Sequence, residues 1–340
     1  MNPLLASVVA LSLGAASLLA ADAPAKPKAK AEAPKAPARF VNDGNPEHLK
    51  SPLAVKPDEN VAYGPHRMQV LYFWRAKSDQ PTPLLFYIHG GGWANGDRSS
   101  VNGMLKEALA AGISVVSVEY RYIKDATEDK VVPPVKGPML DCARALQFVR
   151  SKAKEWNLDK TKVGAAGGSA GACTSLWLAF HDELADPKSE DPIARESTRL
   201  TCAAVQVPQT SLDPKQMREW TPNSGYGAHA FGITGDAKNK ISTFQAFYDA
   251  REQILPWIKE YSPYELVSRD DPPVGLFFGT VPNLGKEEKD PTHSANFGVK
   301  LKEHCDEIKA RCELVYPGAP NVVHANPNDY IKAYLRPELK

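Results

Sequence analysis

The sequence has no concentration of charge of either sign. Its 340 residues include 41 Lys and Arg against 40 Asp and Glu, which leaves a formal net charge of +1. A chain without a basic or acidic block in its main part gives no indication of a nucleic-acid partner or of strong steering of a charged ligand. Internal repeats, C-x-x-C pairs and metal-type His/Cys spacings are also missing, so neither a metal nor a cofactor is expected.

Cysteine is scarce, and its five positions are odd in number: Cys142, Cys173, Cys202, Cys305 and Cys312. At least one thiol is therefore unpaired within a chain. Cys305 and Cys312 bracket the end of one predicted helix, and Cys142 and Cys173 fall on consecutive predicted helices. For both pairs a disulfide and two buried free thiols remain open.

Long apolar runs are absent except for residues 4–21, which end in small residues. The run is short for a membrane span and rich in Ala and Ser, so residues 1–21 are predicted to be a signal peptide, although no positive charge precedes the run. Residues 22–38 form an Ala/Lys/Pro tract that cannot join a core and are predicted to be a disordered linker. We expect a secreted or periplasmic protein whose domain is 39–340, with no stable membrane insertion after cleavage.

The rest of the chain alternates between predicted strands and helices, which indicates an α/β fold with a mostly parallel twisted sheet flanked by helices. Residues 210–243 have little periodicity and are predicted to be a loop or small lid beside the site. The predicted strands are 69–74, 84–89, 113–119, 162–166, 203–207, 274–279 and 312–316, and the predicted helices are 104–111, 139–156, 170–184, 244–260, 294–309 and 328–335.

A serine lies at the centre of the most informative stretch, residues 163–171. The pentapeptide 167–171, Gly-Gly-Ser-Ala-Gly, matches the G-x-S-x-G pattern that places a nucleophile on a tight strand-to-helix turn. Ser169 would occupy that turn, where close backbone contacts admit only minimal side chains. The alternative is a glycine-rich turn with an incidental serine.

A second motif, His-Gly-Gly-Gly-Trp at residues 89–93, directly follows the predicted strand 84–89. Such a loop leaving a strand upstream of G-x-S-x-G supplies backbone N–H groups to an oxyanion. The predicted oxyanion hole consists of the N–H groups of Gly91, Gly92 and Ala170. No cofactor is needed for that chemistry.

The two motifs together resemble the α/β-hydrolase esterase and lipase group, nearest to its bacterial carboxylesterases and feruloyl or acetyl-xylan esterase-like branch. The resemblance covers roughly residues 60–335. It implies the α/β-hydrolase fold and a serine hydrolase that works through an acyl-enzyme. His89 and Trp93 are expected to shape the glycine loop and the floor of the substrate pocket, and His293 is expected to line that pocket.

In this fold the chain order is serine, acid, histidine. His324, after the last predicted strand, is therefore the expected base, and His293 is its main rival. Asp290 is the expected acid, in an Asp-Pro segment that opens the next helix as the family's acid does, although nine residues separate it from the strand end at Thr280. Asp213 is the alternative, because some lipases of this fold carry their acid there.

We therefore expect an exported carboxylic-ester hydrolase that acts on a small-molecule or polysaccharide-linked ester, with removal of acetyl or feruloyl groups as a guess from the resemblance. A serine peptidase of the same fold is one alternative, although Ala170 replaces the aromatic residue that those enzymes more often carry after the serine. A catalytically inactive binding module is the other.

Overall fold

The structure is a computed structural model that describes residues 49–339. The chain divides into two units, residues 1–36 and 37–340, and all described residues belong to the second. The predicted signal peptide (1–21) and linker (22–38) lie outside the described residues.

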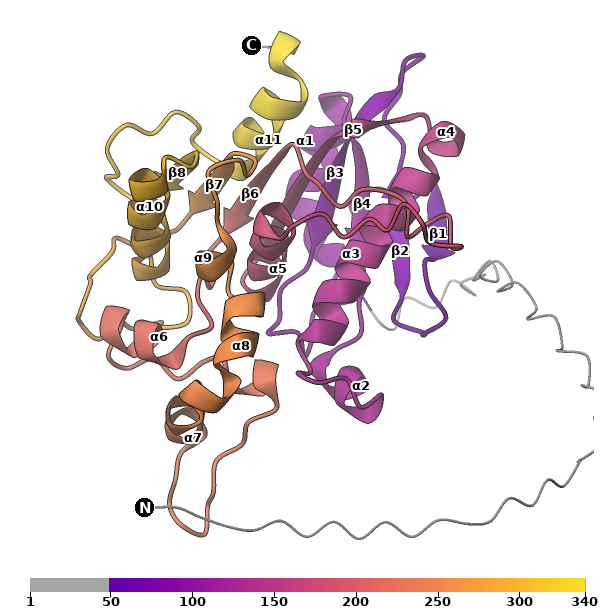
Figure 1. Ribbon diagram of the computed structural model, residues 1–340. Coiled ribbons are helices and arrows are strands. Elements are labelled where there is room, and N and C mark those ends of the chain that lie inside the picture. Colours follow the sequence, from indigo (N-terminus) through magenta and orange to yellow (C-terminus); the bar gives the residue numbers. More distant parts are fainter. Residues whose placement is uncertain (1–48, 340) are drawn as a thin grey trace, which may run out of the picture. The chain divides into compact units, whose positions relative to one another are not determined.

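One sheet forms the centre of the described chain, with the strand order β1-β2-β4-β3-β5-β6-β7-β8 (Figure 1). The first three strands in that order pair antiparallel, and all other neighbours pair parallel. The strands are β1 Glu59–Ala62, β2 Val70–Trp74, β3 Thr82–Ile88, β4 Ser114–Val118, β5 Leu158–Gly168, β6 Cys202–Gln206, β7 Val274–Phe277 and β8 Cys312–Val315.

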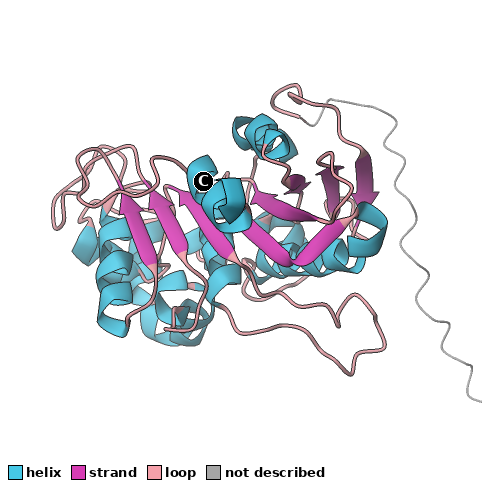
Figure 2. Cartoon of the chain, turned by 90° about the horizontal axis from the view of Figure 1, so that it is seen from above, coloured by secondary structure: helices cyan, strands magenta, loops and turns pink. Residues whose placement is uncertain are grey.

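Helices cover both faces of the sheet, as Figure 2 shows. On β3, Leu84, Phe86 and Ile88 join one apolar cluster, while Leu85 and Tyr87 join another. Successive strand side chains point to opposite faces, so every residue of this central strand is buried. The first face packs against α3 (Lys136–Ser151), α5 (Ala170–Phe180), α8 (Arg251–Tyr261) and α10 (Asn296–Ile308), and the second against α1 (Asn102–Ala110) and α11 (Pro327–Leu335).

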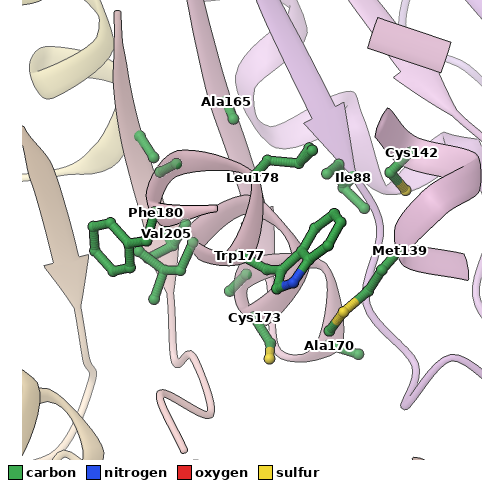
Figure 3. Packing of buried hydrophobic residues seen from close by; sticks show 14 of the residues in the cluster. Ile88, Met139, Cys142, Ala165, Ala170, Cys173, Trp177, Leu178, Phe180 and Val205 are labelled. Carbon is green, nitrogen blue, oxygen red and sulfur yellow. The ribbon is translucent and has the colours of Figure 1, made fainter. Parts of the chain in front are cut away.

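Helix α5 lies at the centre of the first layer. All of its residues are buried, and Figure 3 shows its Trp177 and Leu178 among residues of the neighbouring elements, with Ile88 and Met139 nearby. A helix that is apolar on all sides is stable only in such a core. The start of α5, and with it the serine turn, is therefore held rigidly.

The sequence predicted seven of the eight strands among residues 49–339 to within a few residues. It missed β1, a four-residue strand at the edge of the sheet whose residues are all half-buried. Two predicted helices are each broken in two: α3 is followed by α4 (Ala153–Trp156), and α7 (Thr243–Asp249) by α8. The predicted loop 210–243 contains α6 (Pro214–Trp220) and the short 3-10 helix η3 (Ala228–Phe231). The Asp213 N-cap and Pro214 at the first position were the signal for α6.

The remaining short helices connect the main elements: η2 Arg98–Val101, α2 Ile123–Glu128, α9 Pro263–Leu266 and η4 Pro337–Leu339. All five cysteines are free thiols. The neighbouring Cys305 thiol, together with burial, raises the pKa of Cys312. Within residues 49–339, no helix has the length and apolar character that a membrane span requires.

Candidate active site

Ser169 occupies a strained turn between β5 and α5, with φ 52° and ψ −122°. Its backbone N–H donates to the carbonyl of Gln206 at 3.0 Å, and its own carbonyl accepts from Cys173 at 2.9 Å. A side chain at Gly167 or Gly171 would overlap the backbone carbonyl of Ile88. The neighbouring strands therefore impose the positive φ of the serine, as expected for a nucleophile turn.

His293 lies directly against the serine. Its Nε2 is 2.9 Å from Ser169 Oγ, and its Nδ1 is 2.8 Å from Asp290 Oδ2. Asp290 and His293 share one turn, in which the His293 N–H donates to the Asp290 carbonyl at 3.2 Å. The three side chains form the serine–imidazole–carboxylate series that activates a hydroxyl.

The charge of Asp290 is stabilised by this turn. Partial burial opposes ionisation of the carboxyl group, but hydrogen bonds from His293 and from the backbone N–H of Thr292 outweigh that effect and lower the pKa of Asp290. The carboxylate can therefore hold the imidazole in one tautomer, with the proton on Nδ1 and the lone pair of Nε2 facing Ser169.

The structure corrects the predicted base, because it does not bring His324 to the serine. His324 Nδ1 lies 2.7 Å from Glu313 Oε2, and the backbone N–H groups of Val323 and His324 both donate to Glu313 Oε1 at 2.8 Å. Glu313, on β8, thus holds the loop on which the family pattern expects the histidine. The i,i+3 spacing of Asp290 and His293 was the sequence signal for the observed pair.

Asp213, the alternative acid, has a different role. Its carboxylate accepts two hydrogen bonds from Arg251 Nε and a third from its Nη2 at 2.7 Å, and it caps α6 through the Lys215 N–H. The buried carboxylate is therefore occupied by a structural ion pair. Asp290 is the carboxylate that contacts the histidine beside Ser169.

The glycine loop packs over the serine turn. A β-carbon on Gly90 would lie 3.3 Å from Ser169 Cβ, and Gly91 and Gly92 have φ values of 110° and 63°. Within residues 49–339, the N–H groups of Gly91 and Gly92 donate no backbone or side-chain hydrogen bond. The N–H of Ala170 is at the first position of α5, where no intrahelical acceptor exists.

His89 and Trp93 support this loop from inside the protein. Both are fully buried. His89 Nε2 lies 2.7 Å from Glu119 Oε1 and its Nδ1 2.8 Å from the Gly90 carbonyl, while Trp93 Nε1 donates to Thr174 Oγ1 at 2.9 Å. The expected part of these two residues in shaping the loop agrees with these contacts.

A family model supplies the identification. The model named BD-FAE matches residues 71–289, well over half of the 340 residues. The chain belongs to the BD-FAE family. The matched region includes the glycine loop and Ser169, and it ends one residue before Asp290.

The curated relatives of this BD-FAE chain include esterases. Esterase LipC of Mycobacterium tuberculosis is 31% identical over 152 residues, covering 43% of this chain and 35% of LipC. Gut esterase 1 of Caenorhabditis elegans is 30% identical over 155 residues, covering 43% of this chain and 26% of its own length. The alignments thus span about a third or less of these relatives.

Solved structures confirm the predicted α/β-hydrolase fold. Esterase Est2 of Thermogutta terrifontis superposes with a TM-score of 0.57 at 22% identity, covering 79% of this chain and 84% of Est2. An acetyl ester-xyloside bifunctional hydrolase of Caldicellulosiruptor lactoaceticus gives 0.56 at 19% identity, covering 77% and 86%. At these identities the likeness shows the fold alone.

A cleft of about 560 Å³ opens beside Ser169 in this BD-FAE chain. Most of the lining residues were not predicted from the sequence. They end or follow the parallel strands β5 to β8, and the carboxyl ends of parallel strands meet at one edge of a sheet. They include Gln206, Val207, Phe277, Phe278, Val315 and Asn326. Among residues 49–339, no cluster of three or more His, Cys, Asp or Glu side chains could hold a metal.

Proposed function

We propose that the protein is a serine carboxylic-ester hydrolase with Ser169 as nucleophile, His293 as base and Asp290 as the orienting acid. The observation that supports this proposal most strongly is the continuous pair of contacts Asp290 Oδ2–His293 Nδ1 and His293 Nε2–Ser169 Oγ, at 2.8 and 2.9 Å. Both are hydrogen-bond distances, so proton transfer between serine and imidazole needs no rearrangement.

In the proposed reaction, Ser169 Oγ attacks the ester carbonyl carbon and its proton passes to His293 Nε2. The carbonyl electron pair moves to the oxygen, which the N–H groups of Gly91, Gly92 and Ala170 hold. When this intermediate collapses, the carbon–oxygen bond to the alcohol breaks, and the alcohol leaves with the proton from Nε2. Each oxyanion donor is worth about 3–4 kcal/mol in the transition state.

Water completes the cycle. It gives a proton to His293 Nε2 as its oxygen attacks the acyl carbon, and the second tetrahedral intermediate uses the same oxyanion donors. The bond between Ser169 Oγ and the acyl carbon then breaks, Oγ takes the proton back from Nε2, and the carboxylic acid leaves. Asp290 stabilises the imidazolium in both halves of the cycle without accepting its proton.

The proposed substrate is a short or aromatic acyl ester of a larger alcohol, such as acetylated or feruloylated polysaccharide. Even the β-carbon of an alanine at Gly92 would lie 3.7 Å from His229 and 3.8 Å from Tyr226, so there is little room beyond that part of the glycine loop. The cleft beside Ser169 is wide, and Gln206 and Asn326 can hydrogen-bond hydroxyl groups there. The carbohydrate-ester names of two structural neighbours also support this class.

We also propose that the protein is exported, with residues 1–21 removed and 22–38 serving as a linker. The support is the apolar run 4–21 with its small residues. Mass analysis of the mature N-terminus after expression in a bacterial host tests this proposal. An uncleaved N-terminus that stays with the cells would contradict it.

Hydrolysis of chromogenic esters of increasing acyl length, measured on the full-length chain and on Ser169→Ala, tests the ester reaction. We expect high activity on acetate, low activity on long-chain esters and loss of both in Ser169→Ala. Acetylated and feruloylated xylan are then compared for release of acid. If no simple ester is cleaved and an organophosphate leaves Ser169 unlabelled, the protein is an inactive binding module and not an esterase. If no simple ester is cleaved but Ser169 is labelled, peptide substrates are tested to examine the serine peptidase alternative.

A further inference from the structure

Gln209 lies behind the turn that carries Asp290 and His293. The residue follows β6 in a buried segment in which Gln209, Thr210 and Ser211 are all fully buried. Gln209 Nε2 donates to the carbonyl of Thr292 at 2.7 Å and to that of Val207 at 3.3 Å. One side-chain amide thus connects the residue before His293 to the wall of the cleft.

The amide has only one chemically reasonable orientation. Both neighbours are carbonyl oxygens, which accept hydrogen bonds, so the NH₂ group must face them and the oxygen must point away. Within residues 49–339, Gln209 Oε1 is buried and has no hydrogen-bond partner. A buried unsatisfied acceptor costs about 1–3 kcal/mol, and such a group in a native structure needs an explanation.

The turn itself needs support from the protein interior. The Asp290 side chain is 62% exposed and that of His293 34% exposed. An ion pair this accessible to water adds little to the stability of the turn that carries it, so the position of the turn depends on contacts from the interior. Thr292 lies between the two residues, and its carbonyl is held by the fully buried Gln209. The next residue, Thr210, donates a hydrogen bond from Oγ1 to the carbonyl of Phe297 in α10, at 2.8 Å. The segment that carries Gln209 is therefore also bound to the helix that follows the turn.

The second acceptor lies beside the nucleophile. Val207 lines the cleft with Ser169 and has φ 44°, a value that a β-branched residue rarely adopts. Its N–H donates to the Phe277 carbonyl at 2.9 Å. Gln209 therefore links two segments that must keep a fixed separation if His293 is to remain within hydrogen-bond distance of Ser169.

We propose that Gln209 is a positioning residue that sets the distance between the His293 imidazole and Ser169 Oγ; this role rests on the proposed function. The unsatisfied Oε1 is the cost of placing an N–H donor at the back of the Asp290–His293 turn. Loss of this donor leaves the fold in place and shifts the imidazole. A misplacement of about 1 Å lowers rates on the order of 100-fold.

Gln147 offers a matched control in the same chain. It is also buried, and its Nε2 donates to two backbone carbonyls, those of Ala194 and Glu196, at 3.2 and 2.9 Å. Its two acceptors lie in the loop before β6, at neither the serine nor the histidine turn. Gln209→Met and Gln147→Met therefore remove the same kind of bonds with the same change in shape.

The experiment measures kcat, KM, the rate of Ser169 labelling by an organophosphate and the melting temperature for both variants. We expect Gln209→Met to lower kcat and the labelling rate by about 10- to 100-fold, with KM within about threefold, while Gln147→Met keeps both rates. Gln209→Glu, which has the same size but presents an oxygen to both carbonyls, should show the same loss.

Three outcomes would overturn the inference: Gln209→Met with unchanged kcat, equal losses in the Gln147→Met control, or failure of both Gln209 variants to fold while Gln147→Met folds. The last outcome would make Gln209 a purely structural residue. Failure of the proposed function is distinguishable, because then the unmutated chain cleaves no ester or His293→Ala leaves activity unchanged.

Discussion

Asp290 and His293 are three residues apart in one turn, and Asp290 Oδ2 lies 2.8 Å from His293 Nδ1. Acid and base therefore occupy the same loop after β7 and move together. Ser169 is 124 residues earlier in the chain than His293, yet its Oγ is 2.9 Å from the imidazole Nε2. The position of a single turn thus determines whether the serine is activated.

The clearest prediction compares the two histidines that follow β7 and β8. His293→Ala should lower kcat on a short-chain ester by about 10⁴-fold or more, because within residues 49–339 no other side chain is hydrogen-bonded to Ser169 Oγ to take its proton. His324→Ala should keep kcat within a few-fold, because His324 contacts Glu313. Steady-state kinetics with both purified variants shows which histidine is the base. Inactivation by His324→Ala alone would restore the base expected from the sequence.

The two aspartates should separate activity from stability. Asp290→Asn is expected to lower kcat by about 10²–10⁴-fold, because the imidazole loses the carboxylate that fixes its tautomer. Asp213→Asn should lower the free energy of unfolding by about 1–3 kcal/mol, because it weakens the charged hydrogen bonds to Arg251. Ester hydrolysis and urea unfolding are measured for both variants. A folded Asp213→Asn protein that has lost its activity would reassign the acid.

A pH-dependent effect is expected at Asp271, whose side chain is almost fully buried. Burial raises the pKa of Asp271 from its ordinary 3.8 to about 6, although the Ser268 N–H and Arg199 oppose the shift. The folded protein therefore holds this proton more tightly than the unfolded chain does. The stability that this contributes is complete below about pH 4 and is lost as the pH rises towards about 6.

Asp271→Asn removes the charge and keeps the side chain's shape. We expect the variant to have a free energy of unfolding roughly 1–3 kcal/mol higher than the unmutated protein at about pH 8, and a similar value at about pH 4. Urea unfolding at the two pH values measures the difference. Asp270→Asn, at the exposed neighbour, is the control and should show no such gain. A loss of stability in Asp271→Asn at high pH would contradict the prediction.

Two glycines test the loop over the serine. Gly91→Ala should lower both stability and kcat, because its φ of 110° disfavours a side chain and the added β-carbon would overlap the Asn95 carbonyl. Gly103→Ala is the control: Gly103 is inside α1, and nothing lies within 4 Å of an added β-carbon. The control should gain about 0.5–1 kcal/mol with unchanged kcat. Full activity in Gly91→Ala would exclude the loop from the oxyanion hole.

The central strands and helices were predictable because their patterns are local. Residues 84–88 of β3 form a continuous apolar run and α10 has one apolar face, and each pattern follows from the burial of a single element. The breaks after Ser151 and at Ala250 were not predictable, because the chain there stays compatible with one long helix and only packing decides where it turns.

The sequence by itself determined the serine turn, the glycine loop and the α/β architecture, because glycine patterns and apolar periodicity act over a few residues. Only the tertiary structure decided which histidine meets Ser169. Both His293 and His324 follow late parallel strands, and both have a carboxylate partner at 2.7–2.8 Å. The two loops differ in the contact that holds them. Glu313 on β8 accepts the backbone N–H of His324, whereas Gln209 donates to the carbonyl of Thr292, the residue before His293. These contacts join residues 11 and 83 positions apart, so no local pattern reveals them.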